Sequence, residues 1–235
     1  MLERIILLTD PTEQGFLASV LSTENPNLEI TPVATLEQLR AIEANKFRRA
    51  RLIAFVTPVI VPNDLLHSVG QGAYNFHPGS PDYPGWAPAH FALYDRTKVF
   101  GVTFHAMADL VDSGPILDMD LFPISPDATV VSLEANAYVR LAMMFRRWAG
   151  ALTQDAAPLQ PRLAAQWGSR KNSRRRYRAM CSIPTDIARD DLAHRMSIFG
   201  HGHFGILPSV SLHGFEFKVS PRDETDDIPL SVSIA

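Results

Sequence analysis

Three strand-like segments near the start of the chain constrain its fold more than any other feature. Arg4 to Leu8 is a short apolar run that suits a buried strand, and Leu28 to Ala34 and Leu52 to Val56 are the second and third predicted strands. Between these segments, apolar residues recur at helical spacing, so strands and helices alternate. A helix that crosses from one strand to the next makes the two strands parallel. We therefore predict an α/β protein with an open, Rossmann-like and mostly parallel sheet.

The middle of the chain adds two more strands and one long helix. Val99 to Ala106 and Ile116 to Ile124 have the composition of strands, and together they flank a loop. Beyond them, the apolar spacing predicts an amphipathic helix from about Ala128 to Leu152, with Asp127 as its N-cap. We expect a first domain over residues 1–153 that contains the sheet and this helix.

The last third of the chain differs in composition. Gln154 to Pro161 is rich in Pro and Ala, which is typical of a linker. A basic stretch follows, from Arg170 to Arg178, and strand-like pieces occur near Val210 and Phe215. We expect residues 162–235 to form a small, β-rich C-terminal extension.

Composition and charge limit the classes of function. The 235 residues are 46% hydrophobic with a formal net charge of −3, which suits one ordinary core and gives no general affinity for nucleic acid. The one cysteine excludes an internal disulfide and suits a reducing compartment. The chain has no run of 18 apolar residues and no signal segment. We expect a soluble, cytoplasmic protein without membrane contact.

Three polar residues stand out as a candidate catalytic group. Asn75 and His77 are two residues apart, so their side chains project to the same face of an extended segment. Pro78 and Gly79 then end the strand, and Asp112 lies in a second loop. A carboxamide, an imidazole and a carboxylate that converge in a cleft can transfer protons and stabilise an oxyanion.

Three sequence motifs resemble the signature of the folate-dependent formyltransferases. They are Asn75-Phe76-His77-Pro78, then Gly101-Val102-Thr103-Phe104-His105, then Asp112-Ser113-Gly114-Pro115-Ile116, in the order that the family has them. Members of this family move a formyl group from 10-formyltetrahydrofolate to an amine. The resemblance implies the formyltransferase fold and the same class of reaction.

The chemistry of formyl transfer gives each member of the group a role. Negative charge develops on the formyl oxygen as the amine attacks, and Asn75 together with a protonated His77 can donate hydrogen bonds to it. Asp112 can accept the proton of the amine and, by its charge, raise the pKa of His77. This scheme uses no metal ion.

The resemblance also implies where the folate binds. In the family, the pterin lies against the backbone of two segments, which here are the positions Pro58, Val59, Ile60 and Val61, and Ala108, Asp109, Leu110 and Val111. His105 is either part of the site or a core histidine bonded to backbone, and we give it a supporting role beside the folate. Pro58 departs from the pattern because it lacks an N–H.

The acceptor is open. The short extension and the acidic net charge favour a small-molecule amine, such as a nucleotide-linked amino sugar, over tRNA. A methionyl-tRNA formyltransferase-like enzyme remains an alternative, as does a hydrolase that releases formate from 10-formyltetrahydrofolate. A binding module without turnover is disfavoured by the intact group of three polar residues. A homodimer is left open.

Two further clusters have competing interpretations. Arg170 to Arg178 forms either a solvated surface or a grip for a phosphate-bearing acceptor. His201-Gly202-His203 could hold a metal, but without cysteine partners we favour a structural or exposed role.

Overall fold

The computed structural model describes residues 1–154, 159–161 and 164–219. Its contacts divide the chain into a first unit, Met1–Asn172, and a second unit, Ser173–Ala235. The proposed linker lies partly outside the described residues, and so do the first two and the last sixteen residues of the expected extension. The two units are described separately below.

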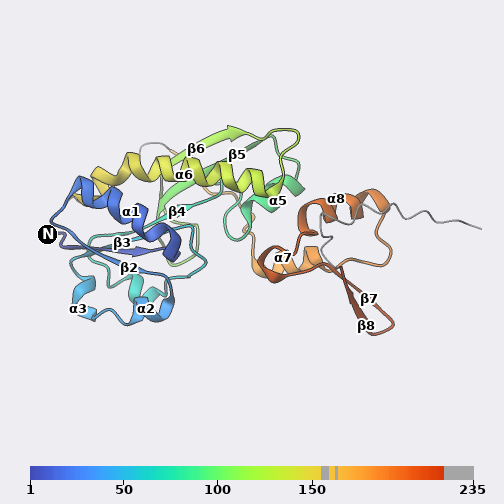
Figure 1. Ribbon diagram of the computed structural model, residues 1–235, viewed down its shortest axis with the longest axis horizontal. Coiled ribbons are helices and arrows are strands. Elements are labelled where there is room, and N and C mark those ends of the chain that lie inside the picture. Colours follow the sequence, from blue (N-terminus) through green and yellow to red (C-terminus); the bar gives the residue numbers. More distant parts are fainter. Residues whose placement is uncertain (155–158, 162–163, 220–235) are drawn as a thin grey trace, which may run out of the picture. The chain divides into compact units, whose positions relative to one another are not determined.

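A six-stranded sheet forms the centre of the first unit (Figure 1). Its strands stand in the order β2-β1-β3-β4-β5-β6, and the first four are parallel to one another. β5 pairs antiparallel with β4, and β6 pairs antiparallel with β5. The predicted open, mostly parallel sheet is therefore confirmed. The strands are β1 (Arg4–Leu8), β2 (Glu29–Val33), β3 (Ala50–Phe55), β4 (Ala73–His77), β5 (Val99–Ala106) and β6 (Ile116–Pro123).

Helices cover both faces of this sheet, and the alternation of side chains along β1 shows how (Figure 1). Ile5 and Leu7 pack into a core under α1 and α6, whereas Ile6 and Leu8 pack into a second core under α2, α3 and α4. A strand that is buried on both faces must be apolar at every position, which explains the continuous apolar runs. The helices of this unit are α1 (Pro11–Glu24), α2 (Leu36–Arg40), α3 (Ala44–Phe47), α4 (Asn63–Leu66), α5 (Pro88–Tyr94) and α6 (Val130–Thr153).

The start of α6 corrects one sequence-based expectation. Thr129, not Asp127, is the N-cap: its hydroxyl accepts a hydrogen bond from the Ser132 N–H, and the Ser132 hydroxyl accepts one from the Thr129 N–H. This reciprocal pair satisfies two backbone donors that would otherwise lack partners. Asp127 instead accepts a hydrogen bond from the Ser125 hydroxyl in the preceding turn.

Arg51 fastens the end of α6 to the sheet. Its side chain is fully buried, although it lies within the apolar run of β3. The guanidinium donates hydrogen bonds to the carbonyl oxygens of Ala151 at 3.1 Å, Leu152 at 2.5 Å and Gln154 at 3.3 Å, and to that of Gln71 at 3.0 Å. The last carbonyls of a helix have no partners within the helix and carry partial negative charge, so a buried cation there is well compensated.

The second unit is small and mixed in structure. It contains α7 (Arg174–Cys181), α8 (Arg189–Phe199), a 3₁₀ turn (His203–Gly205) and a hairpin of β7 (Ser209–Leu212) and β8 (Phe215–Lys218). Tyr177 is buried against Phe199 and Phe204, with ring centroids 5.1 Å and 5.5 Å apart. Helices hold more of its described residues than strands do, so the expectation of a β-rich extension is wrong.

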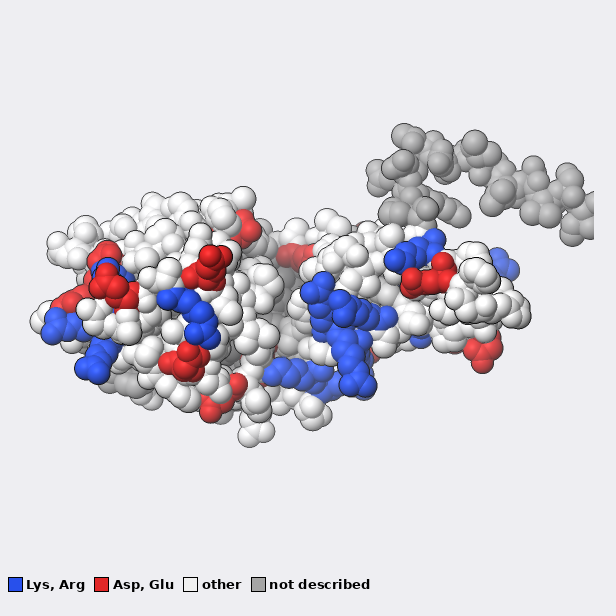
Figure 2. Space-filling model, turned by 90° about the horizontal axis from the view of Figure 1, so that it is seen from below, with Lys and Arg blue, Asp and Glu red and all other residues white. Residues whose placement is uncertain are grey.

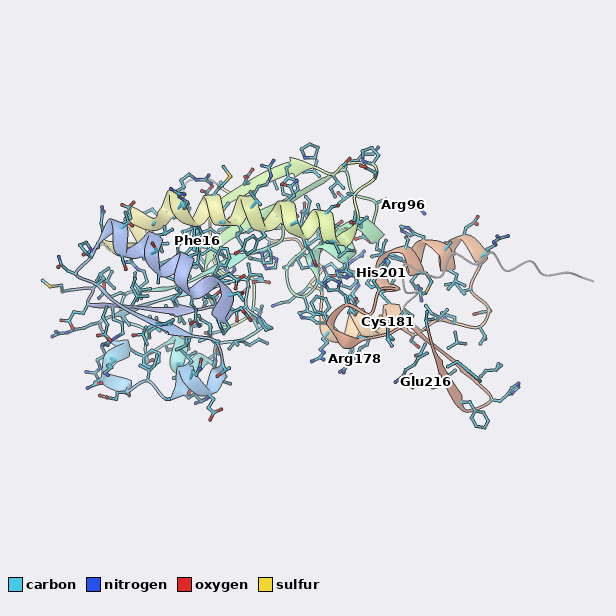
Figure 3. All side chains as sticks on the ribbon, viewed as in Figure 1. Phe16, Arg96, Arg178, Cys181, His201 and Glu216 are labelled. Atoms are coloured by element: carbon cyan, nitrogen blue, oxygen red, sulfur yellow. The ribbon has the colours of Figure 1, made fainter. Side chains whose placement is uncertain are left out.

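One side chain and one surface of the second unit bear on its chemistry. Cys181 on α7 is buried, and burial raises the pKa of its thiol to about 11 (Figure 3). The hairpin carries its apolar residues on one face, because Leu212 pairs with Phe215 and Val210 with Phe217. Both phenylalanines are exposed.

In the described ranges, no helix combines the length and the apolar character that a bilayer span requires.

Replacement of Arg51 by Met should destabilise the protein by about 2–4 kcal/mol, because several buried carbonyls would lose their donor together. Arg49→Met is the matched control, since Arg49 pairs with Glu3 at the exposed surface and such pairs contribute about 0–1 kcal/mol. Urea unfolding followed by circular dichroism measures both variants. Equal effects of the two substitutions would contradict the role given to Arg51.

Candidate active site

The candidate site lies where β4 ends beside β5. Asn75 and His77 are the third and fifth residues of β4, and Asn75 stands directly opposite His105 of β5. Residues that are opposite each other on antiparallel strands bring their side chains within contact distance. His77 and His105 are both buried, so these polar groups interact mainly with one another.

Asp112 completes the group from the loop between β5 and β6. Its carboxylate lies between the two imidazoles: Oδ2 is 3.4 Å from Nδ1 of His77, and Oδ1 is 3.3 Å from Nε2 of His105. Oδ2 also accepts a hydrogen bond of 2.7 Å from the backbone N–H of Gly85. Asp112 has a φ of +45°, a strained value that Asp tolerates better than most residues. The structure thus brings the three residues predicted from the sequence together.

His105 links Asn75 to Asp112. Its Nδ1 lies 2.8 Å from the carbonyl oxygen of Ala106, which only accepts, so Nδ1 carries a hydrogen. In the neutral ring Nε2 is an acceptor, whereas in the protonated ring it donates to Asp112 Oδ1 at 3.3 Å; the Asn75 carboxamide nitrogen lies 3.1 Å from it. The same nitrogen lies 3.5 Å from Asp112 Oδ1, at the outer limit of a hydrogen bond.

Two glycines allow this close packing. A Cβ at Gly79 would lie 2.5 Å from Nε2 of His77. Gly85 has a φ of +92°, and a Cβ there would lie 2.0 Å from the carbonyl oxygen of Asn172. A larger residue at either position would displace the backbone that holds His77 or Asp112.

Asp112 is held as a carboxylate. Burial by itself would raise the pKa of its carboxyl group, but attraction from His77, hydrogen bonding and attraction from His105, and the Gly85 N–H together lower that pKa far below 3.8. The Gly85 contact is a backbone donor and acts at any state of the imidazoles. Asp112 is therefore ionised throughout the physiological range.

The pKa of His77 shifts in the direction opposite to the one expected from the sequence. Burial lowers it, and the attraction of Asp112, which raises it, does not compensate; His105 lowers it further. The pKa of His77 therefore lies below 6.5, so the ring is neutral at neutral pH in the free protein. The Nε2–H donates to the carbonyl oxygen of Tyr83 at 3.2 Å.

Trp167 is a site residue that the sequence reasoning missed. Its ring centroid lies 4.9 Å from that of His105 and 5.9 Å from that of His77, both edge-to-face. Its indole N–H donates a 2.7 Å hydrogen bond to the carbonyl oxygen of Gly114 in the Asp112 loop. A single large aromatic residue within a polar stretch was the only sequence signal for it.

Trp167 belongs to a segment that we call the strap, residues 164–172. The Gly168 N–H donates to the carbonyl oxygen of Pro81 and the Asn172 N–H to that of Pro84, both at 2.8 Å. The strap therefore lies along the loop that carries Gly85. It belongs to the first unit, which extends to Asn172, although the sequence suggested a domain end at residue 153. The functional division into a catalytic domain and an extension stays a prediction.

A cavity of about 520 Å³ adjoins the Asp112 loop. Three of the predicted folate-binding residues, Ala108, Asp109 and Leu110, line it, but Pro58, Val59, Ile60 and Val61 do not. The rest of its lining is Leu66, His67, Val69, Gly72, Ala73, Met107 and Ser113. Because Ala73 and Asn75 are two apart on β4, they face the same side of the sheet. The cavity and the candidate group thus lie on the same face of β4, although none of Asn75, His77, His105 and Asp112 lines the cavity.

The other predicted folate segment follows a strained turn. Val56, at the end of β3, has a φ of +42°, which is unusual for a β-branched residue. Val59 and Val61 pack on the same buried cluster as three residues that line the cavity, Leu66, Val69 and Met107. Ile60 and Leu110 are instead exposed apolar side chains, and Val111 is partly so. Folate binding by either segment stays a prediction.

The two clusters with competing interpretations lie outside this group. Arg170 and Lys171 are in the first unit, where Arg170 lies 3.8 Å from Asp95 and Lys171 donates to the carbonyl oxygen of Val111. The remaining arginines of the stretch are on α7 of the second unit. His201 is exposed (Figure 3), and the His203 ring packs against Phe204.

The histidine titrations provide a direct test of this electrostatic arrangement. We expect the NMR-detected pKa of the His77 ring to lie below 6.5 and to fall further in Asp112→Asn, because the larger of the two interactions that raise it is lost. Since the unfolded chain takes up this proton more readily, His77 favours the folded state above pH 6.5, and that contribution declines as the pH falls. A His77 pKa that rises in Asp112→Asn would contradict this account.

Comparison with known proteins gives a family for the part of the chain that carries this site. Residues 34–140 match the family model described as formyl transferase. A methionyl-tRNA formyltransferase from Listeria monocytogenes serotype 4a is 31% identical over 123 residues, which is 52% of this chain and 38% of that protein. One from Halalkalibacterium halodurans is 41% identical over 75 residues, or 32% of this chain and 24% of that protein. The chain thus matches about two fifths or less of the length of these relatives.

Solved structures share the fold over most of the chain. A sugar N-formyltransferase from Shewanella sp FDAARGOS_354 superimposes with a TM-score of 0.75 at 17% identity, covering 93% of this chain and 96% of that one. A 4-N formyltransferase from Francisella tularensis gives a TM-score of 0.67 at 17% identity, with the same coverage. Residues 34–140, which hold Asn75, His77, His105 and Asp112, thus match the formyl transferase family model, and the solved structures share the fold of this chain.

Proposed function

We propose that this protein transfers a formyl group from 10-formyltetrahydrofolate to an amine. The observation that carries the proposal is the ionised Asp112, which lies between two buried imidazoles and beside the Asn75 carboxamide. The family match covers all four of these residues. It does not reach Trp167. A carboxylate that is kept charged in a buried site is suited to receive a proton from an attacking amine.

The reaction needs two proton movements and one stabilised oxygen. The amine nitrogen attacks the formyl carbon, the C–N10 bond breaks after a tetrahedral intermediate forms, and N10 takes up a proton. Asp112 accepts the proton of the amine, directly or through a water molecule. His77 is neutral in the free protein; the negative charge that develops on the formyl oxygen favours its protonated form, which donates a hydrogen bond to that oxygen.

Asn75 is the second donor to the formyl oxygen. Its carboxamide nitrogen lies 3.1 Å from His105 Nε2 and 3.5 Å from Asp112 Oδ1. The weaker contact is the one that a substrate oxygen can replace at least cost. His105 fixes the orientation of the carboxamide, which agrees with the supporting role that it was given.

The cavity beside the Asp112 loop is the proposed site for the pterin part of the donor. It has a volume that suits a small heterocycle and a mixed apolar and polar lining. Solved relatives support a folate ligand: the structure of an N-formyltransferase from Helicobacter canadensis contains folinic acid and dTDP-3-aminofucose. Its TM-score with this chain is 0.63, at 14% identity.

For the acceptor, we propose a nucleotide-linked amino sugar. Sugar N-formyltransferases share the fold over nearly the full length of this chain, and the Helicobacter canadensis enzyme binds a dTDP-linked amino sugar. The exposed arginines of α7 offer bidentate donors that suit a diphosphate. Figure 2 shows one dense cluster of Lys and Arg side chains, whereas the other basic side chains on that face are scattered among acidic ones.

A methionyl-tRNA acceptor is the alternative that a specific finding favours, because sequence relatives at 31% and 41% identity carry that name. Hydrolysis to formate is a further outcome of the same chemistry, with water in place of the amine. A binding module without turnover is the least favoured, since every group that the reaction needs is present. Homodimerisation stays a prediction.

The test of the function is release of tetrahydrofolate from 10-formyltetrahydrofolate in the presence of candidate amines. His77→Gln and Asp112→Asn should each lower the rate on the order of 10²-fold or more, because each removes a group that meets developing charge. His201→Gln, an exposed histidine, is the control and should keep full activity. Turnover close to the wild-type rate in either site variant would refute the assignment, provided that thermal unfolding shows both variants to be folded.

The acceptor class is tested by a charge change on α7. Arg175→Gln combined with Arg178→Gln should raise the KM for a dTDP-linked amino sugar about tenfold without changing the KM for the folate, because a phosphate contact affects binding alone. Arg48→Gln combined with Arg189→Gln removes the same charge at exposed positions elsewhere and should have no effect.

A tRNA acceptor would reveal itself differently in this experiment. Binding by wild type would then fall steeply with salt, and the α7 variant would reduce that salt dependence. Unchanged kinetics with either acceptor at every salt concentration would identify the α7 arginines as a solvated surface with no part in binding.

A further inference from the structure

The strap places an aromatic wall on the catalytic group. Trp167 of the strap makes ring contacts with both imidazoles that enclose Asp112. The two contacts are edge-to-face, an arrangement in which each ring resists rotation of the other. Because the two histidines adjoin the same carboxylate, the position of the indole constrains all three groups.

The indole is itself held in place by backbone contacts on two sides. Its N–H donates to the carbonyl oxygen of Gly114, two residues after Asp112. The flanking strap residues Gly168 and Asn172 donate to Pro81 and Pro84, and the carbonyl oxygen of Asn172 accepts from the Trp86 N–H at 3.0 Å. Gly85, the donor to Asp112, lies between Pro84 and Trp86 in this contact. The strap therefore supports the Asp112 carboxylate through Gly85 as well as through Trp167.

We propose that Trp167 is a positioning residue that keeps water away from the catalytic group and thereby directs the formyl group to the amine. This inference rests on the proposed formyl transfer and adds a determinant of its outcome. In productive transfer, the acceptor nitrogen forms the new bond to the formyl carbon as the bond to N10 breaks. In the competing reaction, a water oxygen forms that bond, and the products are formate and tetrahydrofolate.

The bulk of the Trp167 ring explains both proposed effects, the positioning of the two imidazoles and the exclusion of water. A bulky apolar ring against two imidazoles occupies volume that water would otherwise fill, and Asp112 can activate water as readily as it can activate an amine. Removal of the ring should admit water and allow the imidazoles to rotate. Asp112, His105 and the carbonyl oxygen of Tyr83 face His77, and none of these three residues is replaced in the variants proposed below.

The test compares Trp167→Ala, Trp167→Phe and Gln166→Ala in the full chain. Formylated amine and formate are measured separately with 10-formyltetrahydrofolate as donor. Trp167→Ala should lower the ratio of transfer to hydrolysis by about tenfold or more, whereas Trp167→Phe, which keeps an aromatic ring, should recover most of it. Gln166 is an exposed neighbour in the strap, so Gln166→Ala should match the wild type.

A second readout does not depend on turnover. The NMR-detected pKa of His77 should rise toward 6.5 in Trp167→Ala, because burial is what lowers it, and should remain close to the wild-type value in Trp167→Phe. An unchanged transfer ratio together with an unchanged His77 pKa in Trp167→Ala would overturn the inference. A loss of thermal stability alone, with both readouts unchanged, would also overturn it.

The two proposals fail in distinguishable ways. If the wild-type protein neither transfers the formyl group nor releases formate, the proposed function is wrong, and the His77 titration still decides whether Trp167 positions the histidines. If the wild type transfers and Trp167→Ala transfers with the same ratio and the same His77 pKa, the function stands and the role of Trp167 is wrong.

Discussion

The buried negative charge of Asp112 is the constraint around which the site is built. A carboxylate removed from water is costly unless donors and opposite charge surround it. Here it receives one backbone N–H, from Gly85, and lies within 3.4 Å of an imidazole on each side. The positive φ of Asp112, the missing side chain at Gly85 and the path of the strap all serve this one requirement. Local strain is tolerated because the surrounding contacts fix it.

The same enclosure has opposite effects on the two titratable partners. For Asp112, nearby donors outweigh burial, so the charged form is favoured. For His77, burial outweighs the attraction of Asp112, so the neutral form is favoured. Groups whose pKa values are shifted from the usual value by burial and neighbouring charges are common at sites where protons are transferred. Asp112 is therefore ionised and His77 is neutral in the free protein, so both groups are unprotonated before substrate binds.

Features that depend on local sequence were predictable, and features that depend on distant partners were not. The strands followed from continuous apolar runs, and Asn75, His77 and Asp112 from motifs that each lie within a few residues. Arg51 looks out of place in its strand because the helix carbonyls that it meets lie about 100 residues later. Trp167 meets the Asp112 loop across 53 positions of sequence, and no local pattern announces such a contact. The direction in which the pKa of His77 shifts depends on the burial of the ring, and a sequence motif does not contain that information.

The strap has a consequence for the order in which the molecule is assembled. The six strands and the catalytic motifs all precede α6 in the chain, whereas the strap follows it. During synthesis from the N-terminus, the sheet can therefore form while Asp112 and the two histidines are still open to solvent. Contacts with such a large separation in sequence are slow to close. In the nascent protein, the sheet can thus form before the candidate site is complete. The strap must leave the ribosome before Trp167 can cover the two histidines.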